Sequence, residues 1–419
     1  MENYKCKSVG IVGSGIQGVC IGLQLIKKGI PVTLFDRHDP LSSEYKAASY
    51  GNAGHFSPYA VLKFNRPDIL KDVPKMLFSS YGPLSLKWNY VFKLIPWFLH
   101  YVKKCNKKSM LHTAKYMNQI CSYADESYEE IFKEINITNL VDKKGIIYVW
   151  SNKNLKKREL EIKVRNDLGI KQKLLTQKEI LNLEPNLNPV FDAGVLYEGS
   201  MFARDPHAIL KEIFKLFLRK GGKFIQENIK TLKQFDENKT VLKSEKADYN
   251  FEKIIIAAGA YSKKLTDQLG ENIPLDTERG YHVHFKNMQK LISRPIICLD
   301  RGFSLSPMNQ GLRAVGTVEL GGLNNPPSKK RIDYLIKSAK EFLPQLDTHY
   351  DEWLGFRPSL PDFLPIIGPS LKNKNIIYAF GHDHLGWTLG AITGKIVSGI
   401  VAEEKTNLDL TPYSSKRFN

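Results

Sequence analysis

This sequence of 419 residues predicts an α/β fold in which a parallel, nucleotide-binding sheet is joined to a second domain with a mixed or antiparallel sheet. Two features carry the prediction. The N-terminal residues follow the order strand, glycine-rich turn, helix, strand, which is the order of a βαβ unit. Between residues 280 and 320, strand-like apolar runs are separated by short Gly, Pro and Asn turns, which is typical of antiparallel strands.

The N-terminal βαβ unit is the first element. The apolar run 8–12 leads into Gly13-Ser14-Gly15-Ile16-Gln17-Gly18, which matches GxGxxG, and a second run, 31–35, closes on Asp36. The first glycine permits the turn, the second lets backbone amides approach a pyrophosphate, and the third packs the helix on the strand. The helix N-terminus adds partial positive charge, and Asp36 has the spacing of an acid that binds a ribose hydroxyl. The unit therefore predicts a Rossmann-type dinucleotide site, although spacing alone does not separate FAD from NAD.

Later segments supply the remaining elements. Asp205-Pro206 has the form of an N-cap followed by proline, so a helix is expected from there to Gly221-Gly222. The strand expected at 253–258 runs into small residues, Ala258 and Gly259 among them, that permit the close approach of a ligand. Further helices are expected at 110–135 and 332–342, strands at 145–150, 281–285, 303–306, 312–317 and 375–380, and a final helix after the loop that begins at Gly381.

Composition excludes several classes of protein. The net charge of +18 comes from basic residues spread along the chain, which favours a solvated basic surface over a nucleic-acid site. Five cysteines without CxxC or Cys/His spacing indicate a reducing compartment and no structural metal. The apolar run 9–26 contains glycines and ends at Lys27-Lys28-Gly29, so it is interpreted as part of the fold and not as a signal peptide. No spanning helix is expected.

Four further motifs follow the glycine motif in order. They are Ser49-Tyr50-Gly51-Asn52-Ala53-Gly54-His55-Phe56-Ser57-Pro58, Glu278-Arg279-Gly280-Tyr281-His282, Gly355-Phe356-Arg357-Pro358-Ser359-Leu360-Pro361-Asp362, and Gly381-His382 through Leu385-Gly386-Trp387-Thr388. Together these motifs resemble the D-amino-acid oxidase superfamily of FAD enzymes, and within it the bacterial D-amino-acid dehydrogenases. The resemblance spans nearly the whole chain and implies FAD as the cofactor.

The resemblance also implies two intertwined domains. The FAD-binding domain would take residues 1–60, 200–270 and 350–419, and the substrate domain would take residues 61–199 and 271–349. The antiparallel sheet of the substrate domain would cover the flavin ring and leave a pocket between the domains.

Cofactor contacts are carried over from the resemblance onto matching positions. Asn52, Ala53 and Gly54 would lie along the isoalloxazine ring, and Ser49 would contact the pyrophosphate or ribitol. The loop before the last helix would face the flavin O2/N1 edge, where the helix N-terminus favours reduction. The full expected set is Gly13, Ser14, Gly15, Ile16, Gln17, Gly18, Asp36, Arg37, Ser49, Asn52, Ala53, Gly54, Ala258, Gly259, Gly381, Leu385, Gly386, Trp387 and Thr388.

One position departs from the family pattern. This chain has Asp383 where the relatives usually have glycine. A carboxylate there would shift the redox potential of the flavin, bind an amine, or point to solvent, and the sequence leaves the three options open.

The candidate catalytic residues are fewer. Arg357 is the first choice for binding a substrate carboxylate, because its planar fork can hold both oxygens. Arg279 and Tyr281 lie on an expected strand of the substrate domain, and His55 and His384 are possible neighbours of the amine or the flavin. No residue is identified as an obligatory base, since the cofactor performs the hydride transfer.

The expected reaction is oxidative deamination of a D-amino acid, with hydride transfer from Cα to flavin N5. A secondary amine such as sarcosine, an opine or D-hydroxyproline is the alternative, and an RNA-modifying flavoprotein is a third, less favoured reading. The electron acceptor is left open between quinone, a carrier and oxygen. The segment Tyr81–Lys108 alternates aromatics with lysines, which fits either an anionic membrane surface or an ordinary core helix pair. A cytoplasmic protein is expected, with peripheral contact at the inner face of the cell membrane as an option.

Overall fold

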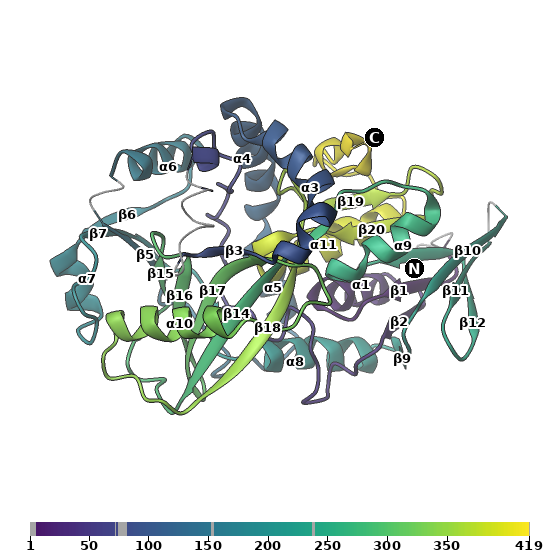
Figure 1. The fold of residues 1–419 in the computed structure, drawn as a ribbon. Helices are drawn as coiled ribbons and strands as arrows, with labels where there is room; N and C mark the ends of the chain where they lie inside the picture. Colours follow the sequence, from purple (N-terminus) through teal and green to yellow (C-terminus); the bar gives the residue numbers. More distant parts are fainter. Residues whose placement is uncertain (1–5, 72, 74–81, 152–154, 237–238, 419) are drawn as a thin grey trace.

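The computed structural model describes residues 6–71, 73, 82–151, 155–236 and 239–418. Tyr81, where the aromatic and lysine-rich segment begins, lies outside the described residues. The described chain forms two large sheets with helices around them, and Figure 1 shows the small sheet β10–β12 at one end of the molecule and α6 and α7 at the other.

The first large sheet is the nucleotide-binding sheet that the sequence predicts. Its six strands take the order β19-β20-β13-β1-β2-β9, and all neighbouring pairs are parallel except that of β19 with β20. The order brings together segments from the N-terminus, the middle and the C-terminus of the chain. The strands are β1 (Val9–Val12), β2 (Val32–Asp36), β9 (Lys223–Gln226), β13 (Lys253–Ile256), β19 (Ile366–Pro369) and β20 (Ile376–Phe380).

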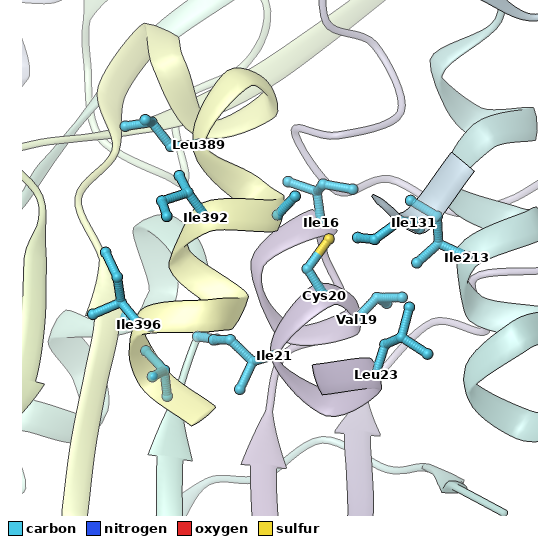
Figure 2. Close-up of a cluster of buried hydrophobic side chains, with 14 of the residues drawn as sticks. Ile16, Val19, Cys20, Ile21, Leu23, Ile131, Ile213, Leu389, Ile392 and Ile396 are labelled. Atoms are coloured by element: carbon cyan, nitrogen blue, oxygen red, sulfur yellow. The ribbon is translucent and has the colours of Figure 1, made fainter. Parts of the chain in front are cut away.

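The helices around this sheet build the largest core of the molecule. Figure 2 shows α1 (Ile16–Lys27) beside α11 (Gly386–Val401), with branched apolar side chains filling the space between them and toward their neighbours. α8 (Pro206–Arg219) contributes Ile213 to the same core, and α5 (Ala124–Phe132) contributes Ile131. The single helix expected over 110–135 is in fact two helices, α4 (Lys107–Cys121) and α5, separated at residues 122–123.

The second large sheet has nine strands and is mostly antiparallel. Its order is β18-β14-β17-β16-β15-β5-β7-β6, with β3 paired to β17 and only β15–β5 and β17–β3 parallel. α10 (Lys329–Phe342) packs on β14 and β17 and covers one face. The strands are β3 (Leu84–Leu86), β5 (Ile146–Trp150), β6 (Lys173–Thr176), β7 (Ala193–Tyr197), β14 (Asp276–Lys286), β15 (Ile296–Cys298), β16 (Phe303–Met308), β17 (Gly311–Leu320) and β18 (Tyr350–Ser359).

The remaining elements are smaller. Two short sheets and the α-helices α3, α6, α7 and α9 are the further elements among the described residues, beside several short 3-10 turns. These elements are β4 (Val141–Asp142), β8 (Phe202–Ala203), β10 (Thr231–Asp236), β11 (Lys239–Lys243), β12 (Asp248–Phe251), α3 (Val91–Lys104), α6 (Leu155–Asp167), α7 (Gln177–Leu183) and α9 (Lys263–Thr266). Among the described residues, none of the helices combines the length and the apolar character needed to cross a bilayer.

The two sheets interleave along the chain, so the division into two domains remains a proposal. β18 follows residue 349 but pairs with β14 in the nine-stranded sheet. α4 and α5 lie between residues 107 and 132, yet they pack against α11 beside the six-stranded sheet.

The five cysteines are all free and buried.

Candidate active site

A cavity of about 1120 Å³ is lined by residues of both large sheets. Its volume exceeds the range of roughly 300–1,000 Å³ that holds one small ligand, so it has room for a large cofactor and a second molecule. At one side it meets the ends of β1, β2 and β13, and at the other it meets β14, β17 and β18.

The glycine motif forms the nucleotide side of the cavity. Gly13 has φ +108°, and a Cβ there would overlap the carbonyl group of Ala257, the residue that follows the neighbouring strand β13. Ser14 donates from its amide (2.8 Å) and its hydroxyl (3.0 Å) to Oδ2 of Asp36, which joins the turn after β1 to the end of β2. Gly15 precedes α1 without a side-chain cap, and the Ile16 amide donates to Ser49 Oγ at 3.0 Å. Gly15 has no side chain to cap α1, so the positive end of the helix dipole is available to bind an anionic group in the cavity.

Several buried polar atoms on the cavity wall lack a partner in the protein. Within the described ranges, Gln17 Oε1, His382 Nδ1 and Trp387 Nε1 have no hydrogen bond. Buried polar atoms are nearly always paired, so these atoms indicate a ligand that supplies both donors and acceptors. The chemistry fits a dinucleotide cofactor, whose heterocycles and hydroxyls carry both kinds of group.

Most residues expected to contact the cofactor line this cavity. They are Gly13, Gly15, Ile16, Gln17, Asp36, Arg37, Ser49, Asn52, Ala53, Ala258, Gly259, Leu385, Gly386 and Trp387. The other five expected residues do not line the cavity but lie directly behind its wall. Two of them make hydrogen bonds there: Ser14 donates to Asp36, and Thr388 accepts from the Ser57 amide. The other three are glycines in close packing contacts: Gly18 with the carbonyl of Gly13, Gly54 with the carbonyl of Ala203, and Gly381 with the Leu360 side chain.

Arg357 lies on the side of the cavity that β14, β17 and β18 line, the side where the substrate is expected from the sequence. Its guanidinium crosses directly over Gly280 of the neighbouring strand, and its Nη1 donates to the carbonyl oxygen of Thr317 at 3.0 Å. Burial lowers the pKa of Arg357 from its usual value, while Glu278 and Asp383 oppose that shift. A buried guanidinium open to a cavity is suited to bind a carboxylate.

Arg279 and Tyr281 lie on the other face of the same sheet, contrary to their expected place at the ligand. Arg279 forms an ion pair with Glu319 (Nε–Oε1 3.2 Å), and the Tyr281 hydroxyl donates to Glu319 at 2.7 Å. Neither lines the cavity. Side chains alternate along a strand, so the residues beside Gly280 point away from the face that Gly280 shares with Glu278.

The two candidate histidines both line the cavity. His55 Nε2 lies 2.7 Å from Ser306 Oγ, and burial lowers the pKa of His55 to about 3, so this ring is neutral. His384 has a side chain that is 32% exposed, and its Nδ1 lies 2.8 Å from Asp383 Oδ1. His384 is therefore the more exposed residue of this ion pair, since the side chain of Asp383 is fully buried.

Asp383 is buried, so the option that its carboxylate points to solvent is wrong. The residue is 5% exposed, has the left-handed φ of +50°, and lines the cavity. Burial alone would raise the pKa of Asp383, but His384 and the Lys63 ammonium, whose Nζ is 3.7 Å from Oδ2, outweigh it and hold this pKa well below its usual range. A strained residue in such a place is a sign of function.

Glu278 is the acidic residue that sequence reasoning did not single out. It is 5% exposed, lines the cavity, and accepts from the Ser359 hydroxyl at Oε1 (2.9 Å). Glu278, Asp383 and His384 offer ligand atoms within 4.8 Å of one another, a spacing that a metal ion can use. Lys63 brings a positive charge to the same cluster, so we assign no metal there. The alternation of β14 from Gly280 was the signal that could have found Glu278.

Comparisons with known proteins agree on one family. The family described as DAO, FAD dependent oxidoreductase, matches residues 8–400. A D-amino-acid oxidase of Bradyrhizobium diazoefficiens is 31% identical over 98% of this chain and 99% of its own length. A D-amino acid dehydrogenase of Vibrio atlanticus is 24% identical over 97% of this chain and 99% of its own.

Solved structures share the fold over the whole chain. A glycine oxidase from Geobacillus kaustophilus superposes with a TM-score of 0.74 at 20% identity, covering 98% of each chain. An L-proline dehydrogenase from P. horikoshii gives a TM-score of 0.75 at 16% identity, covering 99% of this chain and 98% of its own.

Proposed function

The chain belongs to the DAO family of FAD-dependent oxidoreductases, and from this premise we propose that it oxidises the carbon–nitrogen bond of a D-amino acid. The product would be an imino acid, which water converts to the 2-oxo acid. FAD, when bound, supplies the two-electron oxidant that takes the hydride from Cα. The protein supplies binding, orientation and the electrostatic field.

We propose that the nucleotide side of the cavity holds the ADP part of FAD. The N-terminus of α1 and the glycine turn would contact the pyrophosphate, and Asp36 would accept from the ribose, since a carboxylate oxygen that already accepts from Ser14 has further acceptor capacity. Asn52 and Ala53 would lie along the ring, and Trp387 Nε1 would donate to it.

The observation that carries the proposed substrate class is the place of Arg357. A guanidinium that lies across the cavity wall over Gly280 offers its fork to a carboxylate. That contact would fix the amino acid at one end and hold Cα in a defined orientation for hydride loss. The names of the relatives, a D-amino-acid oxidase and a D-amino acid dehydrogenase, favour the D series.

A secondary amine is the second candidate. Structural neighbours include an enzyme named L-proline dehydrogenase and one named iminodiacetate oxidase, and the compounds in both names carry a substituted nitrogen. The same carboxylate contact would serve these substrates. Turnover of N-alkylated glycine, with no activity on D-alanine, would select this reading.

Anaerobic bleaching of the flavin tests both candidates. Purified protein is mixed with D-amino acids, L-amino acids, D-hydroxyproline, sarcosine and opines, and the flavin absorbance is followed. Bleaching by D-amino acids alone supports the main proposal. Bleaching by N-substituted compounds alone moves the assignment to secondary amines, and no bleaching by any of them contradicts both.

We propose in addition that α3 rests on an anionic membrane surface. Leu94, Trp97 and Tyr101 form its buried face. The opposite stripe has helical spacing and is apolar but exposed, with Phe92 84% and Trp88 68% exposed. The stripe consists of Phe92, Leu99 and Val102 on α3 and of Trp88 in the 3-10 turn (Trp88–Tyr90) just before it, and Ile95 lies between this stripe and the cavity. Such a face does not fit an ordinary core helix.

Lysines surround this stripe and complement an anionic bilayer, each adding about 1 kcal/mol of attraction near the surface. Lys93 and Lys103 lie on α3, and Lys107 and Lys108 begin α4. Val91, Ile95 and Phe98 also line the cavity, so α3 forms part of its wall. The position favours a membrane quinone as electron acceptor over a soluble carrier or oxygen.

Cosedimentation with vesicles tests the membrane proposal. We expect binding to vesicles that contain phosphatidylglycerol, weakened by salt and lost in the variant W88S/F92S/L99S. The matched control L174S/L371S removes exposed apolar side chains elsewhere and should bind like the wild type. Absence of binding at low salt, or self-association through α3 in place of binding, would contradict the proposal.

A further inference from the structure

Glu278 has one carboxylate oxygen to which no group of the described protein donates a hydrogen bond. Oε1 accepts from Ser359, whereas Oε2 is buried and, among the residues that the structure describes, makes no hydrogen bond. A buried, unpaired carboxylate oxygen is costly, since the lost hydration is not replaced. Glu278 lines the cavity, so a ligand in the cavity can supply the missing donor.

The register of the sheet places this oxygen beside the expected amino group. Glu278 and Arg357 are direct partners across β14 and β18, so their side chains leave the sheet from adjacent positions, with Cβ atoms about 5 Å apart. An α-amino acid carries its carboxylate and its nitrogen on the same carbon atom. When Arg357 holds the carboxylate, the ammonium lies within reach of Glu278.

His384 lies between the carboxylates of Glu278 and Asp383. His384 Nε2 lies 3.8 Å from Glu278 Oε2, and His384 Nδ1 lies 2.8 Å from Asp383 Oδ1. The two ring nitrogens of His384 therefore face two different carboxylates, Nδ1 that of Asp383 and Nε2 that of Glu278. Of the three side chains, that of His384 is the most exposed, at 32%.

We propose that Glu278 accepts the proton of the substrate ammonium and that His384, positioned by Asp383, passes this proton to solvent. The inference rests on the proposed function. In the step, one N–H bond breaks and the proton goes to Glu278 Oε2. The freed lone pair on nitrogen forms the C=N bond as the hydride leaves Cα for FAD, the oxidant, so charge and electrons balance.

The electrostatic surroundings suit this role. Burial and the charge of Asp383 raise the pKa of Glu278, while His384, Arg357 and the Ser359 hydroxyl oppose the rise. Tyr101 on α3 faces the same carboxylate. A carboxylate with a raised pKa accepts protons near neutral pH better than an ordinary one. It acts above its own pKa, and the step is lost as the pH falls through that value.

The pH profile of flavin reduction tests the proposal. In E278Q, which keeps the acceptor for Ser359, the limiting rate of anaerobic reduction at pH 7 should fall about 100-fold. The loss should shrink as the pH rises toward the pKa of the free amine, because neutral substrate no longer needs a base. E278D, which keeps a carboxylate, should reduce the flavin at least about tenfold faster than E278Q. D383N should shift the acidic limb of the pH–rate profile and lower the rate less than E278Q does.

D276N is the matched control. Asp276 lies two residues away on β14, its pKa is also raised by burial, and it is hydrogen-bonded to Tyr90, but it does not line the cavity. Its pH profile should match the wild type.

Equilibrium binding gives a readout without turnover. 2-Aminoisobutyrate has a carboxylate and an ammonium but no Cα hydrogen, and isobutyrate lacks the ammonium. Binding is followed by flavin absorbance. The wild type should bind 2-aminoisobutyrate more weakly as the pH falls, and E278Q should lose this pH dependence. Isobutyrate should bind to the wild type and to E278Q with the same affinity. Identical pH dependence of E278Q and wild type in rate and binding would overturn the relay. Failure of every amine to bleach the wild type would instead overturn the proposed function.

Discussion

Replacing Gly280 by alanine tests whether the place of one guanidinium determines substrate binding. A Cβ on Gly280 would overlap Cζ and Nη2 of Arg357 and would lie 2.6 Å from Nη1, where ordinary contact begins near 3.4 Å. The guanidinium must therefore move by roughly 1 Å, because the backbone of β14 is fixed between β17 and β18. A displacement of 1 Å at a positioning group costs about 100-fold in rate.

We therefore expect G280A to lower kcat/KM for an amino-acid substrate about 100-fold, which is about 2.7 kcal/mol of transition-state stabilisation. The assay is steady-state turnover over a range of substrate concentrations, together with titration of a plain carboxylate against flavin absorbance. Carboxylate affinity should fall in parallel, since the same guanidinium holds it. Flavin content should stay at the wild-type level.

The control is a double-mutant cycle with R357A. When the guanidinium is absent, the added methyl group has nothing to displace, so G280A should have little further effect in the R357A background. Full additivity of the two losses, or a G280A variant with wild-type carboxylate affinity, would refute the reasoning.

Three further substitutions have defined outcomes. G13A places a Cβ against Ala257 at a φ that side chains rarely adopt, so it should yield protein with little flavin, measured as flavin absorbance per protein. D383G relieves about 1–2 kcal/mol of backbone strain, because glycine adopts the left-handed φ of this position freely. The same change leaves the buried Lys63 ammonium without its counter-ion, at a cost of about 3–5 kcal/mol, so the Tm of D383G should fall. Removing that ammonium as well, in the double variant D383G/K63M, should restore the Tm. Burial raises the pKa of Asp125 from 3.8 to about 6, so its contribution to stability is present below pH 3.8 and is lost as the pH rises through 6. D125N should therefore be more stable than the wild type at pH 8, by at most about 3 kcal/mol, and not at pH 3.5; an equal gain at both pH values in chemical denaturation would contradict this.

The nucleotide side of the cavity was predictable because its constraints are local. A glycine turn, a helix N-terminus and a strand-terminal acid lie within one βαβ unit, and in the structure Ser14 of the turn donates to Asp36 at the end of β2, a contact that the sequence did not predict. The substrate side depends on which face of a long strand meets the cavity. Sequence reasoning chose Arg279 and Tyr281, whereas the face belongs to Glu278 and Gly280.

Other differences come from tertiary packing. Residues 122–123, between α4 and α5, contain no proline or glycine, so the apolar pattern of the sequence predicts one continuous helix there. The exposure of the Trp88–Val102 stripe depends on which side of α3 faces the core, and aromatic content alone does not decide that. Asp383 stood out as a departure from a family pattern, but only the packing of the loop before α11 shows that its carboxylate is buried.

The strand order β20-β13-β1 also has a consequence for synthesis of the chain. The ribosome releases the N-terminal βαβ unit more than 300 residues before α11, which packs on α1. The sheet and α8 cover other faces of α1 earlier, but the face that packs on α11 stays exposed until then. A nascent chain therefore exposes the α11-facing side of α1 for most of translation, and chaperone contact with this apolar face is expected until α11 has been made.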